Sequence, residues 1–337
     1  MKAVGYKTPG AIDREDALQD IELEEPVATG RDLLVRVAAV SVNPVDTKIR
    51  MHIGPDGPDW RVLGWDAAGI VESVGTDVEH FKPGDQVFYA GSLTRQGTNS
   101  EYHVVDERIV GRKPKSLTNA EAAAMPLTAI TAWEMLFERL DVKRPTAAGA
   151  NTILVIGGAG GVGSITIQLL RALTDLTVIA TASRPETQDW VRECGAHHVI
   201  DHSQPLAPQV ELLGIGAPEF VFSTTQTNSH LVDIARLIAP QGRLGLIDDP
   251  LEFDIRQLKH KSISVHWEFM YTRSMFETAD VETQRDLLNQ VSALVDEGKI
   301  KTTLTKIAGK IDAANLKKVH AQIEGGSVRG KIVLEGF

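Results

Sequence analysis

A glycine-rich segment in the middle of the chain carries residues with a clear chemical role. Gly158, Gly160 and Gly163 follow the spacing G-x-G-x-x-G, with Gly161 and Val162 between them. Such glycines let the backbone approach a pyrophosphate, whose negative charge is stabilised by the N-terminus of a following helix. A glycine-rich turn also occurs in α/β domains that bind no cofactor, so the spacing alone is weak evidence.

A second group of polar residues indicates which dinucleotide would bind. The strand expected at 176–181 ends in Thr181-Ala182-Ser183-Arg184, and no carboxylate follows until Glu186. A hydroxyl beside a guanidinium suits a 2'-phosphate, whereas NAD-preferring folds place an acidic residue there. We therefore predict NADPH, the alternative being a helix-start serine with a solvated arginine. His202, after the next strand, is a predicted cofactor neighbour, although lone surface histidines seldom have a specific role.

The elements around the glycines favour the cofactor interpretation. The apolar run Ile153–Ile156 predicts a buried strand, and residues 164–175 carry the pattern of a helix face. Strands and helices then alternate, which predicts an α/β fold with a doubly wound parallel sheet. Strands are expected at 176–181, 197–201, 219–223 and 242–247, and helices at 184–194 and 230–238.

The N-terminal part has a different character. Short strands separated by Gly and Pro, among them 32–42 and 65–74, predict a mostly β, barrel-like fold up to about residue 125. Thr118 and Glu121 have capping-box spacing, and Pro126 should interrupt or restart that helix. A helix at 282–297 and a strand at 331–335 follow the alternating region. We expect this tail to rejoin the first domain, which gives a domain of 1–124 and 266–337 and a dinucleotide-binding domain of 125–265.

Composition limits the classes of partner. Of the 337 residues, 42% are hydrophobic and 24% charged, as is typical of soluble globular proteins, and the net charge is −10. An acidic chain without a long basic run makes nucleic acid and anionic membranes unlikely partners. Cys194 is the sole cysteine, so neither an intrachain disulfide nor a Cys-rich metal site can form. The absence of a signal-type N-terminus and of a membrane-length apolar run predicts a cytoplasmic protein.

Several segments, in this order, resemble the medium-chain dehydrogenase/reductase superfamily, in its zinc-free quinone-oxidoreductase-like branch. The resemblance covers nearly the whole chain, and the order of its segments makes it specific. The matching segments include Ser41–Arg50, Leu63–Val71, Lys82–Val87, Pro126–Trp133, the glycine loop, Gly195–Asp201 and Arg329–Leu334.

The resemblance implies a GroES-like catalytic domain, a Rossmann domain and hydride transfer from nicotinamide in the cleft between them. It also implies a homodimer. By motif position it assigns six residues to the cofactor: Asn43, Thr128, Thr224, Ile247, Gly330 and Lys331. The alternatives are a helix-cap hydroxyl for Thr128 and a solvated strand charge for Lys331.

The departures from the family pattern concern zinc. Zinc-dependent members have Cys where this chain has Asn43, and His where it has Trp65. Asp46 and Asp66 remain, with His52 nearby in sequence, but without a soft ligand they make a poor zinc site. We therefore predict no bound metal and expect that a zinc alcohol dehydrogenase label would be a superfamily label.

Removing zinc changes the chemistry that we expect. Without a Lewis acid, oxidation of a simple alcohol is improbable, whereas a quinone or an α,β-unsaturated carbonyl compound is already polarised. The predicted catalytic residues are Asn43, Asp66 and Lys48, the last standing where many quinone-oxidoreductase relatives have Tyr. A lysine there can stabilise an enolate or donate a proton if it points into the cleft, and is otherwise simply solvated.

Two alternatives to this reductase remain open from the sequence. One is a metal-dependent alcohol dehydrogenase with an unusual carboxylate site. The other is an NADPH-binding sensor or interaction protein with little turnover, because no residue is an unmistakable catalytic acid or base. The aromatic segment Trp267–Arg273 would either line the substrate cleft or pack at a subunit interface. We predict the interface, with some contact to the cleft.

Overall fold

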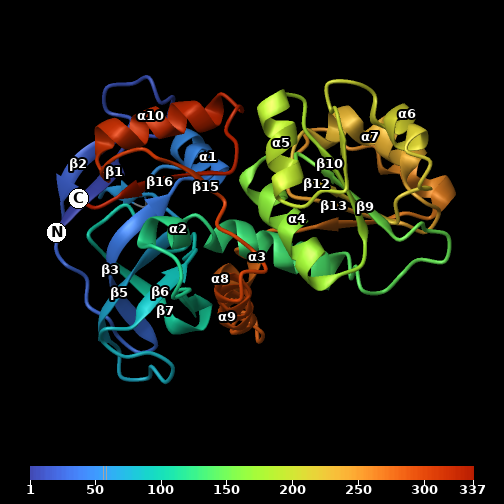
Figure 1. Ribbon diagram of the computed structural model, residues 1–337. Coiled ribbons are helices and arrows are strands. Elements are labelled where there is room, and N and C mark those ends of the chain that lie inside the picture. Colours follow the sequence, from blue (N-terminus) through green and yellow to red (C-terminus); the bar gives the residue numbers. More distant parts are fainter. Residues whose placement is uncertain (56, 58) are drawn as a thin grey trace. The chain divides into compact units, whose positions relative to one another are not determined.

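The computed structural model describes residues 1–55, 57 and 59–337. They form two compact units, which we describe separately (Figure 1). The first unit comprises Met1–Ile130 and Tyr271–Phe337, and the second comprises Thr131–Met270. The boundaries expected from the sequence, 124/125 and 265/266, both come a few residues before these.

The second unit is built on one parallel sheet, as predicted. Its six strands have the order β11-β10-β9-β12-β13-β14, and every neighbouring pair is parallel. The strands β9, β10 and β12 are wholly or almost wholly buried, which explains their continuous apolar runs. The six strands are β9 (Thr152–Ile156), β10 (Thr177–Thr181), β11 (His198–Ile200), β12 (Phe220–Ser223), β13 (Arg243–Leu246) and β14 (Ser264–Trp267).

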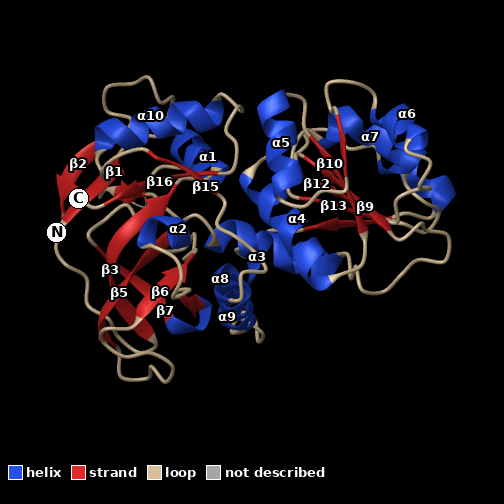
Figure 2. Cartoon of the chain, in the orientation of Figure 1, coloured by secondary structure: helices blue, strands red, loops and turns tan. Residues whose placement is uncertain are grey.

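Helices cover both faces of this sheet, with α4 and α5 on one face and α6 and α7 on the other (Figures 1 and 2). Leu154, Val221 and Leu244 of the strands pack with Leu231 and Ile234 of α7 in the core. This arrangement confirms the doubly wound fold. The helical segments are α4 (Gly161–Leu173), α5 (Pro185–Glu193), α6 (Leu206–Leu212), α7 (Thr227–Leu237) and the 3-10 segment η3 (Ile255–Lys261).

Three elements of this unit were missed from the sequence: β14, α6 and the 3-10 segment η3. The alternation was expected to end at about residue 265, whereas β14 continues the sheet to Trp267. This edge strand is half-exposed, so it lacks the apolar run that marks a buried strand. The short helix α6 contains Pro208 and was not recognised either.

The first unit is mostly β, as predicted, and contains a three-stranded and a seven-stranded sheet. In the larger sheet β16 lies antiparallel to β3, with Val333 opposite Ser41, so the tail does return to this unit. The smaller sheet has the order β2-β1-β4; the larger has the order β15-β16-β3-β5-β6-β8, with β7 also pairing with β3. The strands are β1 (Lys2–Tyr6), β2 (Gln19–Glu22), β3 (Asp32–Ser41), β4 (Arg61–Val62), β5 (Ala67–Val74), β6 (Gln86–Tyr89), β7 (Tyr102–Asp106), β8 (Val110–Arg112), β15 (Leu304–Ile307) and β16 (Lys331–Glu335).

Short helices complete this unit. The capping box before α2 is confirmed, because the Thr118 N–H donates to Glu121 Oε2 at 2.9 Å and the Glu121 N–H donates to Thr118 Oγ1 at 3.2 Å. Pro126 begins α3, which continues into a π-helical turn, η2, across the boundary between the units. The helical segments are α1 (Pro44–His52), η1 (Glu107–Ile109), α2 (Asn119–Ala123), α3 (Pro126–Glu134), η2 (Met135–Arg139), α8 (Thr272–Phe276), α9 (Thr283–Asp296) and α10 (Ala313–Glu324).

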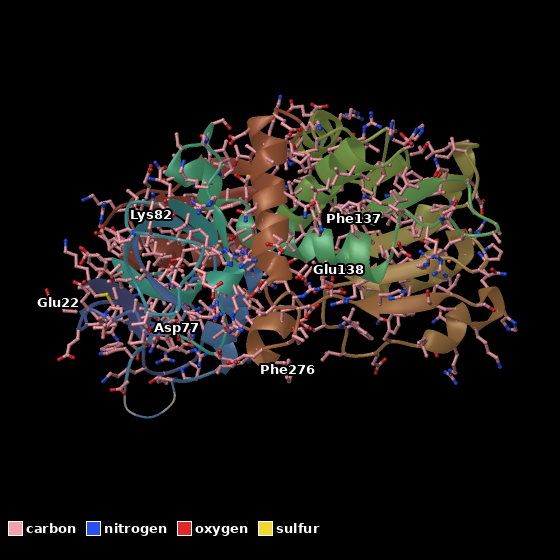
Figure 3. The ribbon with its side chains drawn as sticks, turned by 90° about the horizontal axis from the view of Figure 1, so that it is seen from below. Glu22, Asp77, Lys82, Phe137, Glu138 and Phe276 are labelled. Carbon is pink, nitrogen blue, oxygen red and sulfur yellow. The ribbon has the colours of Figure 1, made fainter. Side chains whose placement is uncertain are left out.

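The surface carries many charged side chains, among them Glu22, Asp77 and Lys82 (Figure 3). Within the described residues, no helix combines the length and the apolar character that crossing a bilayer requires.

Candidate functional site

The glycine loop joins β9 to α4, and its glycines meet different constraints. A Cβ at Gly163 would lie 2.3 Å from the Gly157 carbonyl oxygen, and one at Gly158 would lie 2.9 Å from the Ala180 Cβ. By contrast, a Cβ at Gly160 would meet only the Gly157 carbonyl oxygen, at 3.5 Å. Packing therefore requires Gly158 and Gly163, whereas Gly160 borders open space at the start of a 13-residue helix. That open space beside a helix N-terminus fits a pyrophosphate group.

Polar groups at neighbouring strand ends hold this loop. The Gly157 N–H donates to Thr181 Oγ1 at 3.0 Å, and this hydroxyl lies 3.1 Å from His202 Nδ1. Burial lowers the pKa of His202, so its ring is neutral at pH 7. On the other side, the Thr224 hydroxyl donates to the Ile156 carbonyl at 2.9 Å. The predicted residues His202 and Thr224 thus lie at the carboxyl edge of the sheet with the loop, where α/β folds bind ligands.

Ser183 and Arg184 lie between β10 and α5, with Arg184 at the N-cap of α5. Arg184 Nε pairs with Glu186 Oε1 at 3.1 Å, and the two side chains are 43% and 58% exposed. An exposed pair of this kind contributes little to stability. The exposed guanidinium can therefore also bond a phosphate group, with which arginine forms paired N–H···O bonds.

A buried polar network in the first unit joins three of the predicted residues. Lys331 Nζ lies 3.0 Å from Asp66 Oδ2 and also donates to Asn43 Oδ1. The Asn43 amide donates to Asp66 Oδ2 at 2.9 Å, and the Leu127 N–H donates to Asp66 Oδ1 at 2.8 Å. Lys331, Asn43 and Asp66 are only 4%, 1% and 0% exposed. We call Lys331, Asn43 and Asp66 the lysine network.

Three elements bring the lysine network together. Asn43 is the N-cap of α1, and its N–H donates to Asp46 Oδ2 at 2.7 Å. Lys331 begins β16, whose pairing with β3 places it beside the segment that leads into α1. Asp66 immediately precedes β5, which pairs with the other edge of β3. The network therefore depends on the sheet register, because one residue of slippage would turn these side chains to the opposite face.

Burial changes the ionisation of the groups around this network. It raises the pKa of Asp46 to about 7, against the lowering effects of the Asn43 N–H and Lys331. Burial also raises the pKa of Asp66, but Lys331 Nζ and the Asn43 and Leu127 N–H groups favour its ionised form. Because an ammonium and two N–H groups face the Asp66 carboxyl, we treat it as ionised.

Trp65 and Tyr271 form an aromatic wall in the same unit. Their ring centroids are 6.5 Å apart with an interplanar angle of 77°, and both side chains are buried. Trp65 Nε1 donates to the Ser92 carbonyl at 3.1 Å. Burial, together with the charges of Asp46 and Asp66, raises the pKa of Tyr271 well above its ordinary value, so this phenol is neutral.

Two family models match the chain: the alcohol dehydrogenase GroES-like domain over residues 29–115 and the zinc-binding dehydrogenase model over residues 161–285. The zinc-type alcohol dehydrogenase-like protein SAS2087 of Staphylococcus aureus (strain MSSA476) is 37% identical over 99% of each chain. The chain belongs to the medium-chain dehydrogenase/reductase superfamily.

Further members of the superfamily extend this relationship. The human mitochondrial NAD(P)H oxidoreductase RTN4IP1 is 30% identical over 90% of this chain and 81% of its own. A crystal structure of a protein from Rhizobium etli CFN 42, provisionally named a zinc-dependent alcohol dehydrogenase, is 62% identical, with a TM-score of 0.99 over 100% and 98% of the two chains. The quinone oxidoreductase of Pseudomonas syringae pv. Tomato DC3000 is 25% identical, with a TM-score of 0.81 over 99% of each chain. This medium-chain dehydrogenase/reductase is therefore an oxidoreductase.

In this medium-chain dehydrogenase/reductase, which matches a zinc-binding family model, the two positions of zinc ligands are occupied by Asn43 and Trp65. Trp65 offers no lone pair, and its N–H is already bonded to Ser92. Asn43 Oδ1 accepts from the Lys331 ammonium, which is itself a cation. Within the described part of the chain, no group of three or more His, Cys, Asp or Glu side chains is arranged to hold a metal ion. These residues do not fit zinc.

The remaining predicted residues occupy varied environments in this medium-chain dehydrogenase/reductase. Lys48 is exposed on α1 and follows Asp46 by two residues, which places it on the opposite side of that helix. Thr128 is buried inside the first turn of α3, and its hydroxyl donates to the Met125 carbonyl, three residues back, at 3.1 Å. Gly330 has a φ of +54°, a conformation that favours glycine directly before Lys331. Ile247 directly follows β13.

Two backbone groups that the sequence did not predict also contribute to the lysine network. One is the Val42 carbonyl, 3.3 Å from Lys331 Nζ, and the other is the Leu127 N–H. Backbone groups carry no residue-type signal, so a sequence gives no sign of them. The helix α1 was also missed, although Asn43 before Pro44 is a recognisable N-cap and first-turn pair.

Proposed function

We propose that this protein is a zinc-independent, NADPH-dependent oxidoreductase that reduces quinones or α,β-unsaturated carbonyl compounds. The observation that carries this proposal is the lysine network, in which an ammonium bonds the side chain that replaces a zinc-ligating cysteine. Without a Lewis acid, an enzyme cannot readily lower the pKa of a bound alcohol. An acceptor that is already polarised needs orientation and hydrogen-bond donors instead.

The choice of cofactor rests on the second unit. NADPH, when bound, supplies the hydride. The glycine loop and the N-terminus of α4 would hold its pyrophosphate, and Ser183 and Arg184 would hold its 2'-phosphate. The nearest following carboxylate, Glu186, pairs with Arg184 at 3.1 Å rather than reaching toward a ribose hydroxyl.

The relatives support the same reaction class. The structural neighbour from Pseudomonas syringae is named a quinone oxidoreductase, and the human relative is named an NAD(P)H oxidoreductase. Others carry alcohol dehydrogenase names, so the acceptor has to be decided by experiment.

The predicted catalytic residues divide into two groups under this proposal. Lys48 has an exposed side chain and is our candidate for contact with the developing enolate or quinol oxygen. Asn43 and Asp66 are positioning residues, because their side chains bond to each other and to Lys331.

A panel of acceptors tests the proposal. In the reduction assay, purified protein is mixed with NADPH or NADH and with 1,4-benzoquinone or an enone. In the oxidation assay, it is mixed with a primary alcohol and the oxidised cofactor. Both assays are run with and without a chelator. We expect NADPH oxidation with the quinone or the enone, unaffected by the chelator. Alcohol oxidation abolished by the chelator would instead establish the metal-dependent dehydrogenase. Tight NADPH binding without turnover of any acceptor would establish the sensor.

We also infer a homodimer, supported by the free edge of the parallel sheet. Among the strands of the described residues, β14 pairs with β13 alone, and Trp267 and Phe269 are 53% and 50% exposed. An edge strand with exposed aromatic side chains is suited to cover by a second copy. Light scattering of the wild type and of Trp267→Lys tests this, with Val232→Lys on α7 as a matched control. A monomeric wild type would contradict it.

A further inference from the structure

We infer that Trp190 is a positioning residue for the dinucleotide, because it joins the helix that carries Arg184 to the helix that begins at the glycine loop. The inference rests on the proposed function, in which Arg184 binds the 2'-phosphate and the loop binds the pyrophosphate. It adds a coupling between these two phosphate sites. Trp190, which belongs to neither site, would thereby control the selectivity for NADPH over NADH.

The helix α5 fixes the backbone position of Arg184. The Arg184 carbonyl accepts from the N–H groups of Thr187 at 3.0 Å and of Gln188 at 2.9 Å. The Arg184 N–H donates to Thr187 Oγ1 at 3.2 Å. Because these bonds make Arg184 the N-cap of α5, any shift of this helix would displace the guanidinium as well.

Two consecutive hydrogen bonds lead from α5 to the glycine loop. Trp190 Nε1 donates to Ser164 Oγ at 2.8 Å, and the Ser164 hydroxyl donates to the Gly160 carbonyl at 2.7 Å. Ser164 lies in the first turn of α4 and is 0% exposed, so water does not compete for its hydroxyl. The Gly160 carbonyl also accepts from the Ser164 N–H at 2.9 Å. Two donors therefore hold this carbonyl toward the helix, while the N–H groups of the first turn face the helix N-terminus.

An apolar contact from the next residue of α5 supports this link. A Cβ at Gly158 would lie 3.2 Å from Val191 Cγ1, so Val191 packs directly on the loop. Val191 is 0% exposed, and α4 and α5 cover the same face of the sheet (Figure 1). The helix α5 therefore carries Arg184 at its N-terminus and contacts the glycine loop and α4 near its C-terminus.

This link matters for a ligand that occupies both phosphate sites. The covalent structure of NADPH fixes the spacing between its 2'-phosphate and its pyrophosphate. Binding is strongest when the protein already holds its two sites at that spacing, because less ordering is then needed. NADH lacks the 2'-phosphate and does not require the spacing. Loss of the indole N–H should therefore weaken the binding of NADPH and not that of NADH.

The test compares Trp190→Phe, which keeps an aromatic ring and removes the N–H, with the wild type. Trp60→Phe in the first unit is the matched control, since its ring contact with the Lys7 ammonium does not need an indole N–H. Calorimetric titration with NADPH and with NADH gives the two Kd values. We expect Trp190→Phe to weaken NADPH binding about 10-fold and to change the Kd of NADH less than about twofold. Unchanged NADPH affinity, or an equal loss for both dinucleotides, would overturn the inference.

A double variant separates positioning from a general loss of structure. In Arg184→Ala/Trp190→Phe the positioned guanidinium is absent, so we expect the NADPH Kd of Arg184→Ala alone. Additive losses would overturn the inference. Ser164→Ala breaks the same link from α4 and should lower the selectivity for NADPH in the same direction, which keeps the test decisive if Trp190→Phe folds poorly.

The wild type distinguishes a failure of this inference from a failure of the proposed function. A wild type that binds NADH and not NADPH would contradict the proposed cofactor and the positioning role of Trp190 together. A wild type that prefers NADPH, with Trp190→Phe and Ser164→Ala sharing its full preference, would overturn the role of Trp190 alone. All of these readouts are binding constants, so none depends on which acceptor is reduced.

Discussion

The glycine loop of the second unit and the lysine network of the first unit differ in how accessible their polar groups are. The loop is built so that backbone remains accessible, and a Cβ at Gly160 would meet a single protein atom within 4 Å, at 3.5 Å. In the lysine network an ammonium, an amide and a carboxylate instead bond one another and are almost fully buried. Substitution of Gly160 should therefore change ligand binding, whereas substitutions in the network should change stability.

The two units also contribute differently to the proposed reaction. A dinucleotide supplies its own reactivity, so the second unit only has to hold it. In the first unit, the Lys331 ammonium bonds the Asn43 side chain, which stands where zinc-dependent members of the superfamily have a cysteine. We propose that the protein works without zinc, which would restrict the reaction to acceptors that need no Lewis acid.

The largest effect is expected from Asp66→Ala. It leaves the Lys331 ammonium buried without its carboxylate, which should reduce the free energy of unfolding by about 3–5 kcal/mol. Chemical denaturation of this variant and of the exposed control Asp77→Ala measures the difference. Equal stability of the two variants would show that the network is dispensable.

A pH-dependent effect should come from His103, which is also buried in the first unit. Its Nδ1 lies 3.1 Å from the Tyr89 hydroxyl and its Nε2 lies 2.9 Å from the Gln96 carbonyl. Burial lowers the pKa of His103 to about 4 in the folded chain, against an ordinary value of 6.5. The unfolded chain therefore binds the proton first, and stability present above pH 6.5 is lost as the pH falls to 4.

The free energy of unfolding should fall by about 3 kcal/mol over this pH range. Denaturation curves between pH 7.5 and 4 should show a steeper decline for the wild type than for His103→Gln. Parallel declines of the two proteins would argue against this titration.

Gly160→Val should weaken NADPH binding by about 100-fold with little change in Tm, because the new side chain would occupy the space proposed for the pyrophosphate. The backbone tolerates the change, since Gly160 has a φ of −71°. Fluorescence titration gives the Kd. Gly163→Ala is the contrasting variant, because its Cβ would lie 2.3 Å from the Gly157 oxygen and should lower the Tm. Unaltered NADPH affinity in Gly160→Val would place the cofactor elsewhere.

The smallest effect is expected from Arg184→Ala. Loss of the guanidinium should weaken NADPH binding by roughly 10–30-fold and leave NADH binding unchanged, because only NADPH carries the 2'-phosphate. Glu186→Ala serves as the control and should not weaken NADPH binding, since it frees Arg184 from its carboxylate partner. An equal loss for both cofactors would remove Arg184 from the 2'-phosphate site.

The sequence predicted much of the second unit, because its signals are local. The run Ile153–Ile156, the glycine spacing and the helix after it lie within about twenty consecutive residues, and all three elements are present. The edge strand β14 was missed because its half-exposed residues lack a continuous apolar run. Strand ends also predicted where Thr224 and His202 would lie, since parallel strands end at one edge.

The lysine network could not be predicted in the same way. Lys331 and Asp66 are separated by 265 positions in the chain, and their contact depends on the pairing of β16 with β3. From the sequence, Lys331 was compatible with cofactor contact or with a solvated strand charge. The structure contradicts the solvated charge, because the sheet buries Lys331 in an ion pair with Asp66, a carboxylate that the sequence pattern could not connect to it. Contact of Lys331 with the cofactor stays a prediction.

The pairing of β16 with β3 also has a consequence for the order in which the protein is made. A ribosome completes Asp66 early, but it adds Lys331 only after every residue of the second unit has been translated. Until then the nascent first unit contains a carboxylate without its ammonium and a sheet without β16. The first unit can therefore be completed only after the whole second unit has been synthesised. The second unit can fold while the first unit still lacks its C-terminal segment.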